Sequence, residues 1–163
     1  MPYRVCFVCL GNICRSPTAE AVLRAKVAAA GLEGRVAVDS AGTGDWHVGQ
    51  QMNPPARSQL TARGYDGARH RARQFQRSWL AERDLILAMD ASNLAALRRY
   101  AGADPEHRVR LFGEVAGLGG ADVPDPYGGD RAEFASVLDL LETGMTNLTD
   151  QLRTLLQAPV AER

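Results

Sequence analysis

Residues 5–17 read VCFVCLGNICRSP, a short apolar run that leads into a glycine-containing loop and then into a helical pattern. A continuous apolar run of this length is typical of a strand that is buried on both faces. The five residues between Cys9 and Arg15 are enough to form a cradle whose backbone N–H groups point inward. The N-terminus of the following helix and the arginine guanidinium can close the same cavity around a tetrahedral dianion. We therefore expect a strand–loop–helix unit with a Cys9 thiolate nucleophile at its floor.

The length and composition are those of one globular domain, which we expect to span residues 1–163. The 19 basic and 19 acidic residues give a formal net charge of zero, so neither nucleic acid nor an anionic membrane is expected as a partner. No apolar stretch approaches the roughly 20 residues of a membrane helix, and the N-terminus does not read as a signal peptide. We expect a cytoplasmic monomer or weak dimer, with export without a signal peptide left open.

The rest of the chain alternates strand and helix patterns, without repeats. This order predicts an α/β fold with a parallel sheet covered by helices on both faces, and with its ligand at the carboxyl ends of the strands. Residues 113–130 are rich in Gly, Pro and Asp and are expected to form a long functional or mobile loop. Residues 158–163 are expected to be a frayed end. Further strands are expected at 36–38, 85–89 and 109–112, and helices at 17–30, 54–63 and 90–100 and as one or two segments within 134–155.

The chain has three cysteines, and all of them lie between residues 6 and 14. An odd number in so short a segment does not form a disulfide framework. No second cluster of Cys or His follows, so a zinc site is not expected. Cys6 lies within the first strand and is expected to pack as a small buried hydrophobe.

Three residues of the loop have side chains or backbones suited to shaping a cradle. Gly11 permits a positive φ, and Asn12 can adopt a left-handed conformation or hold the loop through side-chain hydrogen bonds. Ser16 can donate to the Cys9 sulfur. It can also be the N-cap of a helix with Pro17 at its first position, and both interpretations stay open.

If the Cys9 thiolate attacks the phosphorus of a phosphate monoester, the reaction also needs an acid, because an unassisted alkoxide or phenolate is a poor leaving group. Asp125 is the candidate, since it lies between two prolines and shortly before two glycines in the segment VPDPYGG, residues 123–129. The alternative is an Asp-Pro turn that leads into the last helix. The planar guanidinium of Arg15 suits two phosphate oxygens better than an ammonium group does.

Four segments occur in the order found in one enzyme family: residues 9–17, SAGT at 40–43, MDASN at 89–93 and DPY at 125–127. Over residues 3–155 the chain resembles the low-molecular-weight protein tyrosine phosphatases. The resemblance implies a flavodoxin-like or Rossmann-like three-layer sandwich, with a four-stranded parallel sheet flanked by helices, and a two-step hydrolysis without metal or cofactor. It further implies that Cys9 attacks phosphorus to form a phosphocysteine, that Arg15 holds the phosphate oxygens, and that Asp125 is the general acid and then the base.

The resemblance also assigns roles around the reacting groups. The partners it implies are phosphotyrosine-containing proteins, and a tyrosine kinase system is left open as a further partner. Ser40 and His70 correspond to supports of the loop, although His70 can also be a surface residue in a basic segment. Trp46 and Tyr127 correspond to two aromatic walls of a substrate cleft, with simple loop packing as the alternative for Trp46, and His47 to a selectivity residue or an exposed one. The phosphate-binding residues implied are Leu10, Gly11, Asn12, Ile13, Cys14, Arg15 and Ser16.

Three further points follow from the same resemblance. Cys14 corresponds to a redox guard that captures an oxidised Cys9 as a disulfide, or it is simply a small residue that fits the loop. Gly128 stands where many relatives have a second tyrosine. The competing interpretations are an arsenate reductase, which relays electrons through downstream cysteines that this chain lacks, and a non-catalytic phosphate-binding module.

Overall fold

The computed structural model describes residues 1–157, so the frayed end expected at 158–163 lies outside the described residues. No helix within residues 1–157 is long and apolar enough to cross a membrane. The elements, in chain order, are β1 (Tyr3–Cys9), α1 (Arg15–Ala29), β2 (Val36–Gly42), α2 (Pro54–Ala62), α3 (Trp79–Glu82), β3 (Leu85–Ala88), α4 (Ala91–Ala101), β4 (Val109–Leu111), α5 (Phe112–Val115) and α6 (Arg131–Gln157).

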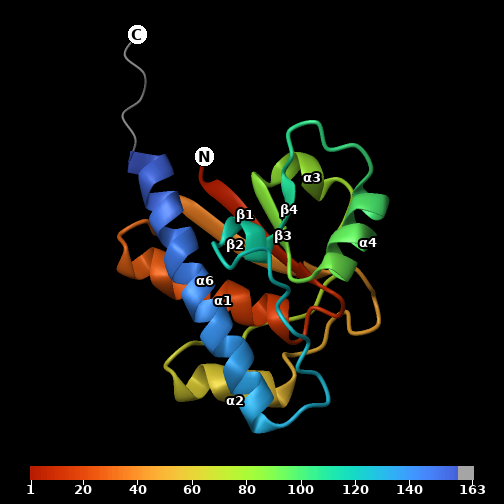
Figure 1. Ribbon diagram of the computed structural model, residues 1–163, viewed down its shortest axis with the longest axis vertical. Helices are drawn as coiled ribbons and strands as arrows, with labels where there is room; N and C mark the ends of the chain where they lie inside the picture. The colour runs from red at the N-terminus through yellow and green to blue at the C-terminus, as the bar shows by residue number, and fades with distance from the viewer. Residues whose placement is uncertain (158–163) are drawn as a thin grey trace.

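The four strands form one parallel sheet in the order β2-β1-β3-β4 (Figure 1). Parallel strands cannot be joined by a tight turn, so each connection must cross the sheet, which explains the alternation of strands and helices. β1 lies inside the sheet, where Val5 pairs with Val38 of β2 and with Leu85 of β3. The structure confirms the predicted four-stranded parallel sheet.

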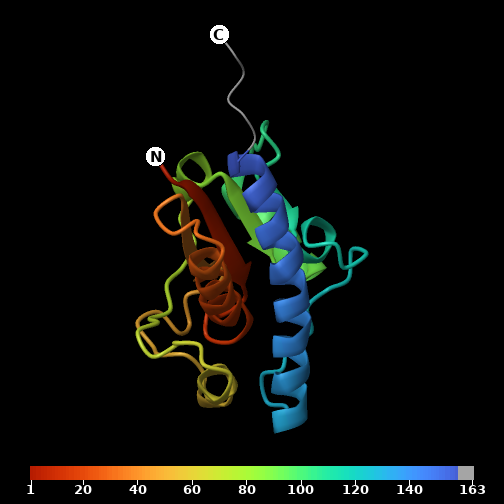
Figure 2. The same cartoon turned by 90° about the vertical axis from the view of Figure 1, so that its left-hand side faces the viewer.

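Helices cover both faces of this sheet, which makes three layers. Alternate residues of β1 point to opposite faces. Val5 and Phe7 belong to the larger core cluster under α1 and α6, and Cys6 and Val8 belong to the smaller cluster under α4. Figures 1 and 2 show α6 running alongside α1, and Figure 1 shows α3 and α4 on the other side of the sheet. Cys6 is fully buried, as expected of a small hydrophobe.

Some boundaries differ from those expected. The strand expected at 36–38 continues to Gly42, because Ser40 and Gly42 stay paired with β1 in spite of their low strand propensity. The expected long loop at 113–130 begins inside α5, and α3 was not expected, since a four-residue helix is too short to show a periodic pattern. The closing segment is the single helix α6, which is 27 residues long.

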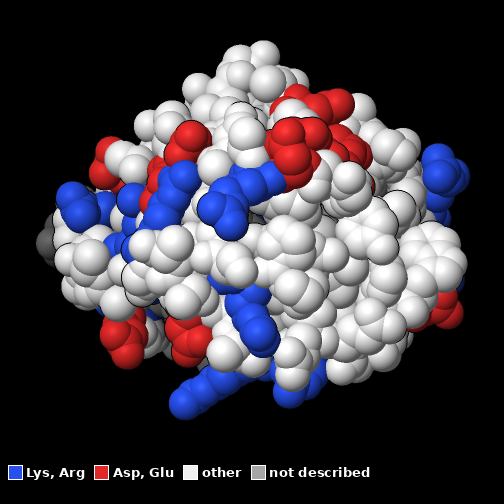
Figure 3. Space-filling view, turned by 90° about the horizontal axis from the view of Figure 1, so that it is seen from below, with Lys and Arg blue, Asp and Glu red and all other residues white. Residues whose placement is uncertain are grey.

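The distribution of charge agrees with a net charge of zero. Seen from below, basic and acidic side chains lie together in the upper half, a few basic side chains lie along the lower edge, and most of the centre is uncharged (Figure 3). Any attraction for an anion must therefore come from local geometry.

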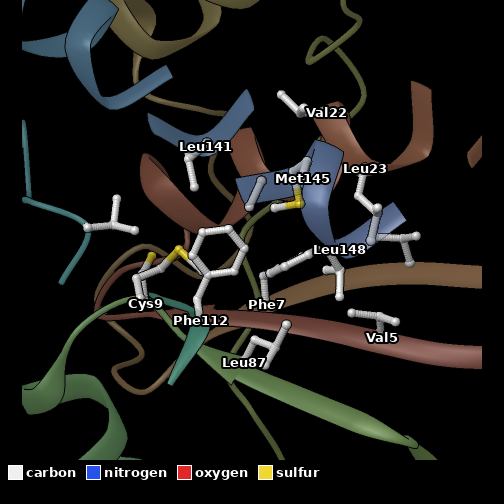
Figure 4. Packing of buried hydrophobic residues seen from close by; sticks show 14 of the residues in the cluster. Val5, Phe7, Cys9, Val22, Leu23, Leu87, Phe112, Leu141, Met145 and Leu148 are labelled. Atoms are coloured by element: carbon white, nitrogen blue, oxygen red, sulfur yellow. The ribbon is translucent and has the colours of Figure 1, made fainter. Parts of the chain in front are cut away.

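A glycine allows α6 to approach the sheet closely. Gly144 lies inside α6 against the ring of Phe112, where an added β-carbon would come within 2.6 Å of Phe112 Cζ. The same ring meets Phe7 of β1 edge to face, with centroids 6.0 Å apart. Figure 4 shows the Phe112 ring beside Phe7 and near the α6 residue Leu141. Phe112 thus joins the sheet to α6, and the absence of a side chain at Gly144 makes room for it.

We expect Gly144→Ala to destabilise the protein by about 1–3 kcal/mol, because overpacking against an immobile ring outweighs the gain in helix propensity. Urea unfolding measures the change. Thr143→Ala, at the exposed neighbouring position, is the control and should change stability by less than about 0.5 kcal/mol. Equal stability of Gly144→Ala and the parent would contradict this account of the packing.

Candidate active site

The candidate site lies where β1, β2 and β3 end at the same edge of the sheet. Cys9, the last residue of β1, pairs with Gly42, the last residue of β2. The backbone of Met89, just beyond β3, donates to the Val8 carbonyl at 3.0 Å and accepts from Val123 at 2.8 Å. These bonds attach the long loop to the sheet edge beside Cys9, which is where parallel α/β sheets bind ligands.

The Cys9–Ser16 loop turns sharply at Asn12. Asn12 has a φ of +57°, and asparagine is among the few side chains that tolerate this left-handed region. The sequence offered both Gly11 and Asn12 for a left-handed conformation, and the structure places it at Asn12 and not at Gly11. Gly11 instead lets the His47 ring lie close to the loop, because a β-carbon at Gly11 would lie 2.9 Å from Cδ2 of His47.

Four hydrogen bonds hold Asn12, which is completely buried. Its Nδ2 donates to Ser16 Oγ and to Ser40 Oγ, each at 2.9 Å. Its Oδ1 accepts the backbone N–H of Arg73 at 2.9 Å, and its carbonyl oxygen lies 2.7 Å from Nε2 of His70. Ser40 and His70 therefore lie behind the loop and contact it through this one residue.

Ser16 connects Asn12 to the nucleophile. Its Oγ accepts from Asn12 and lies 2.9 Å from Sγ of Cys9. Because Ser16 Oγ accepts from Asn12, its own proton can point at the sulfur, 2.9 Å away, or at the Ala41 carbonyl, 3.4 Å away. The structure does not support the N-cap interpretation, since α1 begins at Arg15 with Cys14 as its N-cap. Pro17 is the third helical residue, where its missing N–H removes no intrahelical bond.

Arg15 is buried and fixed by two groups from distant segments. Its NH1 donates to Asp90 Oδ2 at 2.7 Å and to the Val123 carbonyl at 2.9 Å. Its NH2 lies 3.7 Å from Asp125 Oδ2. Within residues 1–157, its buried Nε has no hydrogen-bond partner, which leaves a donor for a bound anion. The guanidinium is thus oriented by the Asp90 carboxylate and the Val123 carbonyl, and it keeps a free donor.

Asp90 was not singled out as a site residue from the sequence. Its Oδ1 accepts the Asn93 N–H at 2.7 Å and so caps α4, while its Oδ2 holds Arg15. The available signal was its position directly after β3, on the edge where the other site residues lie. The cap of α4 is sufficient to explain an aspartate at this position. Only the tertiary structure shows that Asp90 also contacts Arg15.

A pocket of about 170 Å³ opens above Cys9. Trp46 and Tyr127 line its mouth with 66% and 59% of their surfaces exposed, and the half-exposed Asp125 lies beside them. The Trp46 ring lies directly on Gly44, where a β-carbon would come within 1.8 Å of Cζ3. The full set of lining residues is Cys9, Leu10, Gly11, Ile13, Cys14, Arg15, Trp46, His47, Asp125 and Tyr127.

The structure therefore separates the expected site residues into two groups. Ten of them line the pocket, and the remaining four, Asn12, Ser16, Ser40 and His70, form the support behind it. His47 Nδ1 lies 3.0 Å from Gln50 Oε1, which orients its ring at the pocket edge. Within residues 1–157, no three His, Cys, Asp or Glu side chains are grouped as metal ligands would be.

The second cysteine of the loop is held in its thiol form. Burial, together with the neighbouring Cys9 and Asp125, raises the pKa of Cys14 to about 12 against the opposing effect of Arg15. Cys14 is therefore a neutral wall of the pocket at neutral pH and does not compete with Cys9 as a nucleophile.

Comparison with known proteins places this geometry in context. A family model described as low molecular weight phosphotyrosine protein phosphatase matches residues 4–158. A low molecular weight protein-tyrosine-phosphatase of Streptomyces coelicolor is 49% identical over 166 residues, covering 99% of this chain and 100% of the relative.

Solved structures agree with this. The crystal structure of a protein tyrosine phosphatase from Entamoeba histolytica matches with a TM-score of 0.88 and 34% identity, covering 94% of this chain and 99% of that one. The arginine phosphatase YwlE of Bacillus subtilis, solved with a phosphorylated active-site serine, matches with a TM-score of 0.82 and 28% identity, covering 92% and 95%. The chain belongs to the low molecular weight phosphotyrosine protein phosphatase family.

Proposed function

We propose that the protein hydrolyses phosphotyrosine in phosphoproteins, without a metal ion, through a phosphocysteine on Cys9. The observation that carries the proposal is the convergence, in one pocket, of a buried thiol 2.9 Å from a hydroxyl, a fixed guanidinium and a half-exposed carboxyl group. Nucleophile, phosphate anchor and acid are the three groups that phosphomonoester hydrolysis needs. The comparisons favour this interpretation over an arsenate reductase and over a non-catalytic module.

In the first step, the Cys9 thiolate attacks phosphorus and the P–O bond to the tyrosyl oxygen breaks. Inward N–H groups of the Cys9–Ser16 loop and Arg15 offset the repulsion between thiolate and phosphate dianion. Asp125 transfers its proton to the leaving phenolate, so that a neutral tyrosine departs. The half-exposed position of Asp125 at the pocket mouth is where such a leaving oxygen would lie.

In the second step, Asp125, now a carboxylate, removes a proton from water as the water attacks the phosphocysteine. The P–S bond breaks, inorganic phosphate leaves and the thiolate is restored. The Ser16 hydroxyl stabilises this departing sulfur through the 2.9 Å contact. The oxygens of the transferred group stay with Arg15 throughout, because Asp90 and Val123 hold the guanidinium in one orientation.

The walls of the pocket support a preference for tyrosine. A flat phosphorylated ring fits between Trp46 and Tyr127, and its length lets the phosphate reach the buried sulfur. A phosphoserine is too short to reach Cys9 while its backbone stays outside. We further propose a cytoplasmic, single-domain enzyme over residues 1–163, a monomer or weak dimer, that opposes a tyrosine kinase.

Hydrolysis of p-nitrophenyl phosphate in the presence of EDTA tests the mechanism. Cys9→Ser should lower kcat at least about 1,000-fold, because the hydroxyl is a far weaker nucleophile. Asp125→Ala should lower kcat about 10²–10⁴-fold for phosphotyrosine, whose leaving group needs the proton, and less for p-nitrophenyl phosphate.

Asp122→Asn is the matched control, since Asp122 lies in the same loop but only caps the Ala91 N–H. It should leave both rates unchanged. Phosphoserine and phosphoarginine peptides should be poor substrates beside a phosphotyrosine peptide. Activity that survives in Cys9→Ser, or that EDTA abolishes, would exclude the proposed reaction.

We propose that His70 and Ser40 support the Cys9–Ser16 loop through Asn12. Burial lowers the pKa of His70, together with Arg73 and Arg24, although its bond to Asn12 and the nearby Glu20 oppose the shift. The folded state therefore binds a proton less readily than the unfolded chain, in which the histidine pKa is about 6.5.

This difference makes stability depend on pH. The contribution of neutral His70 is present above about pH 6.5 and is lost as the pH falls through the folded-state pKa. His70→Gln keeps an N–H donor for Asn12 but does not titrate. We expect the free energy of unfolding in urea to fall less in His70→Gln than in the parent between about pH 8 and about pH 5. An equal fall in both proteins would contradict the assigned role.

We also propose Cys14 as the redox guard of Cys9. Peroxide oxidises the Cys9 thiolate to a sulfenic acid and is reduced to hydroxide. The Cys14 thiol then attacks the sulfenic sulfur, a disulfide forms and water leaves. Both sulfurs lie in one loop, and the raised pKa of Cys14 keeps it reduced until Cys9 has reacted.

After peroxide inactivation, dithiothreitol should restore most of the parent activity and much less of the activity of Cys14→Ser, in which Cys9 is oxidised irreversibly. Cys6→Ala is the control, because Cys6 is buried in the smaller core cluster under α4. Recovery of Cys14→Ser as complete as that of the parent would exclude the guard.

A further inference from the structure

An aromatic and ionic cluster lies outside the pocket, next to the segment that supports the loop. Two guanidinium groups lie over the indole ring of Trp79, which belongs to α3. The Cζ of Arg83 is 3.9 Å from the ring centroid, and the Cζ of Arg73 is 4.6 Å from it. Phe75 meets the same indole edge to face at 5.6 Å. We call Trp79, Arg73, Arg83 and Asp39 the indole clamp.

Both guanidiniums of the indole clamp share one carboxylate oxygen. Asp39 Oδ2 accepts from Arg73 at 2.8 Å and from Arg83 at 2.5 Å. The Arg83 side chain is only 5% exposed, whereas that of Arg73 is 46% exposed. An exposed ion pair alone orders a long side chain weakly. A planar guanidinium that stacks on an aromatic face and also pairs with the Asp39 carboxylate is held more firmly than by the ion pair alone.

Arg73 connects the indole clamp to the reacting centre through its hydrogen bonds. Its side-chain Nε donates to the Ser40 carbonyl at 3.2 Å, while its backbone N–H donates to Asn12 Oδ1 at 2.9 Å. Asn12 in turn donates to Ser16, which contacts the Cys9 sulfur. A continuous set of contacts therefore runs from the Trp79 ring to the nucleophile.

We infer that Trp79, together with Arg83 and Asp39, is a positioning residue for catalysis. By holding Arg73 in one place, the indole clamp fixes the donor that keeps Asn12 in its left-handed conformation and so keeps the Cys9–Ser16 loop in the shape that binds phosphate. The residues of the indole clamp do not touch the substrate. This inference rests on the proposed role of Cys9.

The test compares kcat for p-nitrophenyl phosphate and the inhibition constant for inorganic phosphate in four proteins besides the parent. Trp79→Leu and Arg73→Lys each remove the stacking of the Arg73 guanidinium on the Trp79 ring. Each should lower kcat and weaken phosphate binding about fivefold. Trp79→Phe restores a smaller aromatic face and should recover most of both quantities. Tyr100→Leu is the matched control and should match the parent.

Tyr100 suits this purpose because its ring also meets Phe75, at 6.5 Å, but contacts neither guanidinium. A purely structural role for Trp79 would lower the midpoint of thermal unfolding in Trp79→Leu and Tyr100→Leu and leave phosphate inhibition unchanged in both. That result would overturn the inference. If Trp79→Leu does not fold, Arg73→Lys decides, since it keeps the core volume.

The same measurements distinguish a failure of the proposed phosphatase activity from a failure of the proposed role of the indole clamp. If the parent protein neither hydrolyses p-nitrophenyl phosphate nor is alkylated at Cys9 in competition with phosphate, the proposed function is wrong. If the parent does both and Arg73→Lys has the kinetic constants of the parent, only the role of the indole clamp is wrong.

Discussion

The positive φ of Asn12 is the constraint on which the rest of the site depends. A non-glycine residue in this region costs of the order of 1 kcal/mol and persists only when its surroundings enforce it. Here four hydrogen bonds to one buried side chain and its carbonyl do so. They come from α1, β2 and the segment after α2, so the loop takes its shape only once these parts have packed together.

A second constraint is the burial of the Arg15 charge. A guanidinium that is 3% exposed needs partners, and Asp90 and Asp125 provide them at 2.7 and 3.7 Å. The shorter contact belongs to a carboxylate that also caps α4 and is therefore immobile. The longer contact belongs to the carboxyl group with the proposed proton-transfer role. One partner thus orients the cation while the other is left loose enough to change its protonation state.

Features that depend on residues close together in the sequence could be predicted from it. The strand–loop–helix unit at residues 5–17, the parallel sheet and the family follow from contiguous patterns, and the structure and comparisons bear them out. The Ser16 cap and the end of β2 were wrong because strand pairing and helix entry depend on neighbours distant in sequence. Asp90 and the Arg73 backbone could not be assigned, since their contacts join residues more than 60 positions apart. The roles of individual site residues stay predictions.

The pairing of β1 on both sides has a consequence for how the site responds to fluctuation. Cys9 ends a strand that β2 and β3 hold on either side, so we expect the amide hydrogens of this strand to exchange with solvent more slowly than those of the loops. Trp46 and Asp125 lie in exposed loops, at the low end of the range of local stability. We therefore expect warming or mild denaturant to release Trp46 and Asp125 before the strand that carries Cys9. Under such conditions we expect Cys9 to keep its position at the end of β1 after Trp46 and Asp125 have become disordered, so that activity is lost before the sheet unfolds.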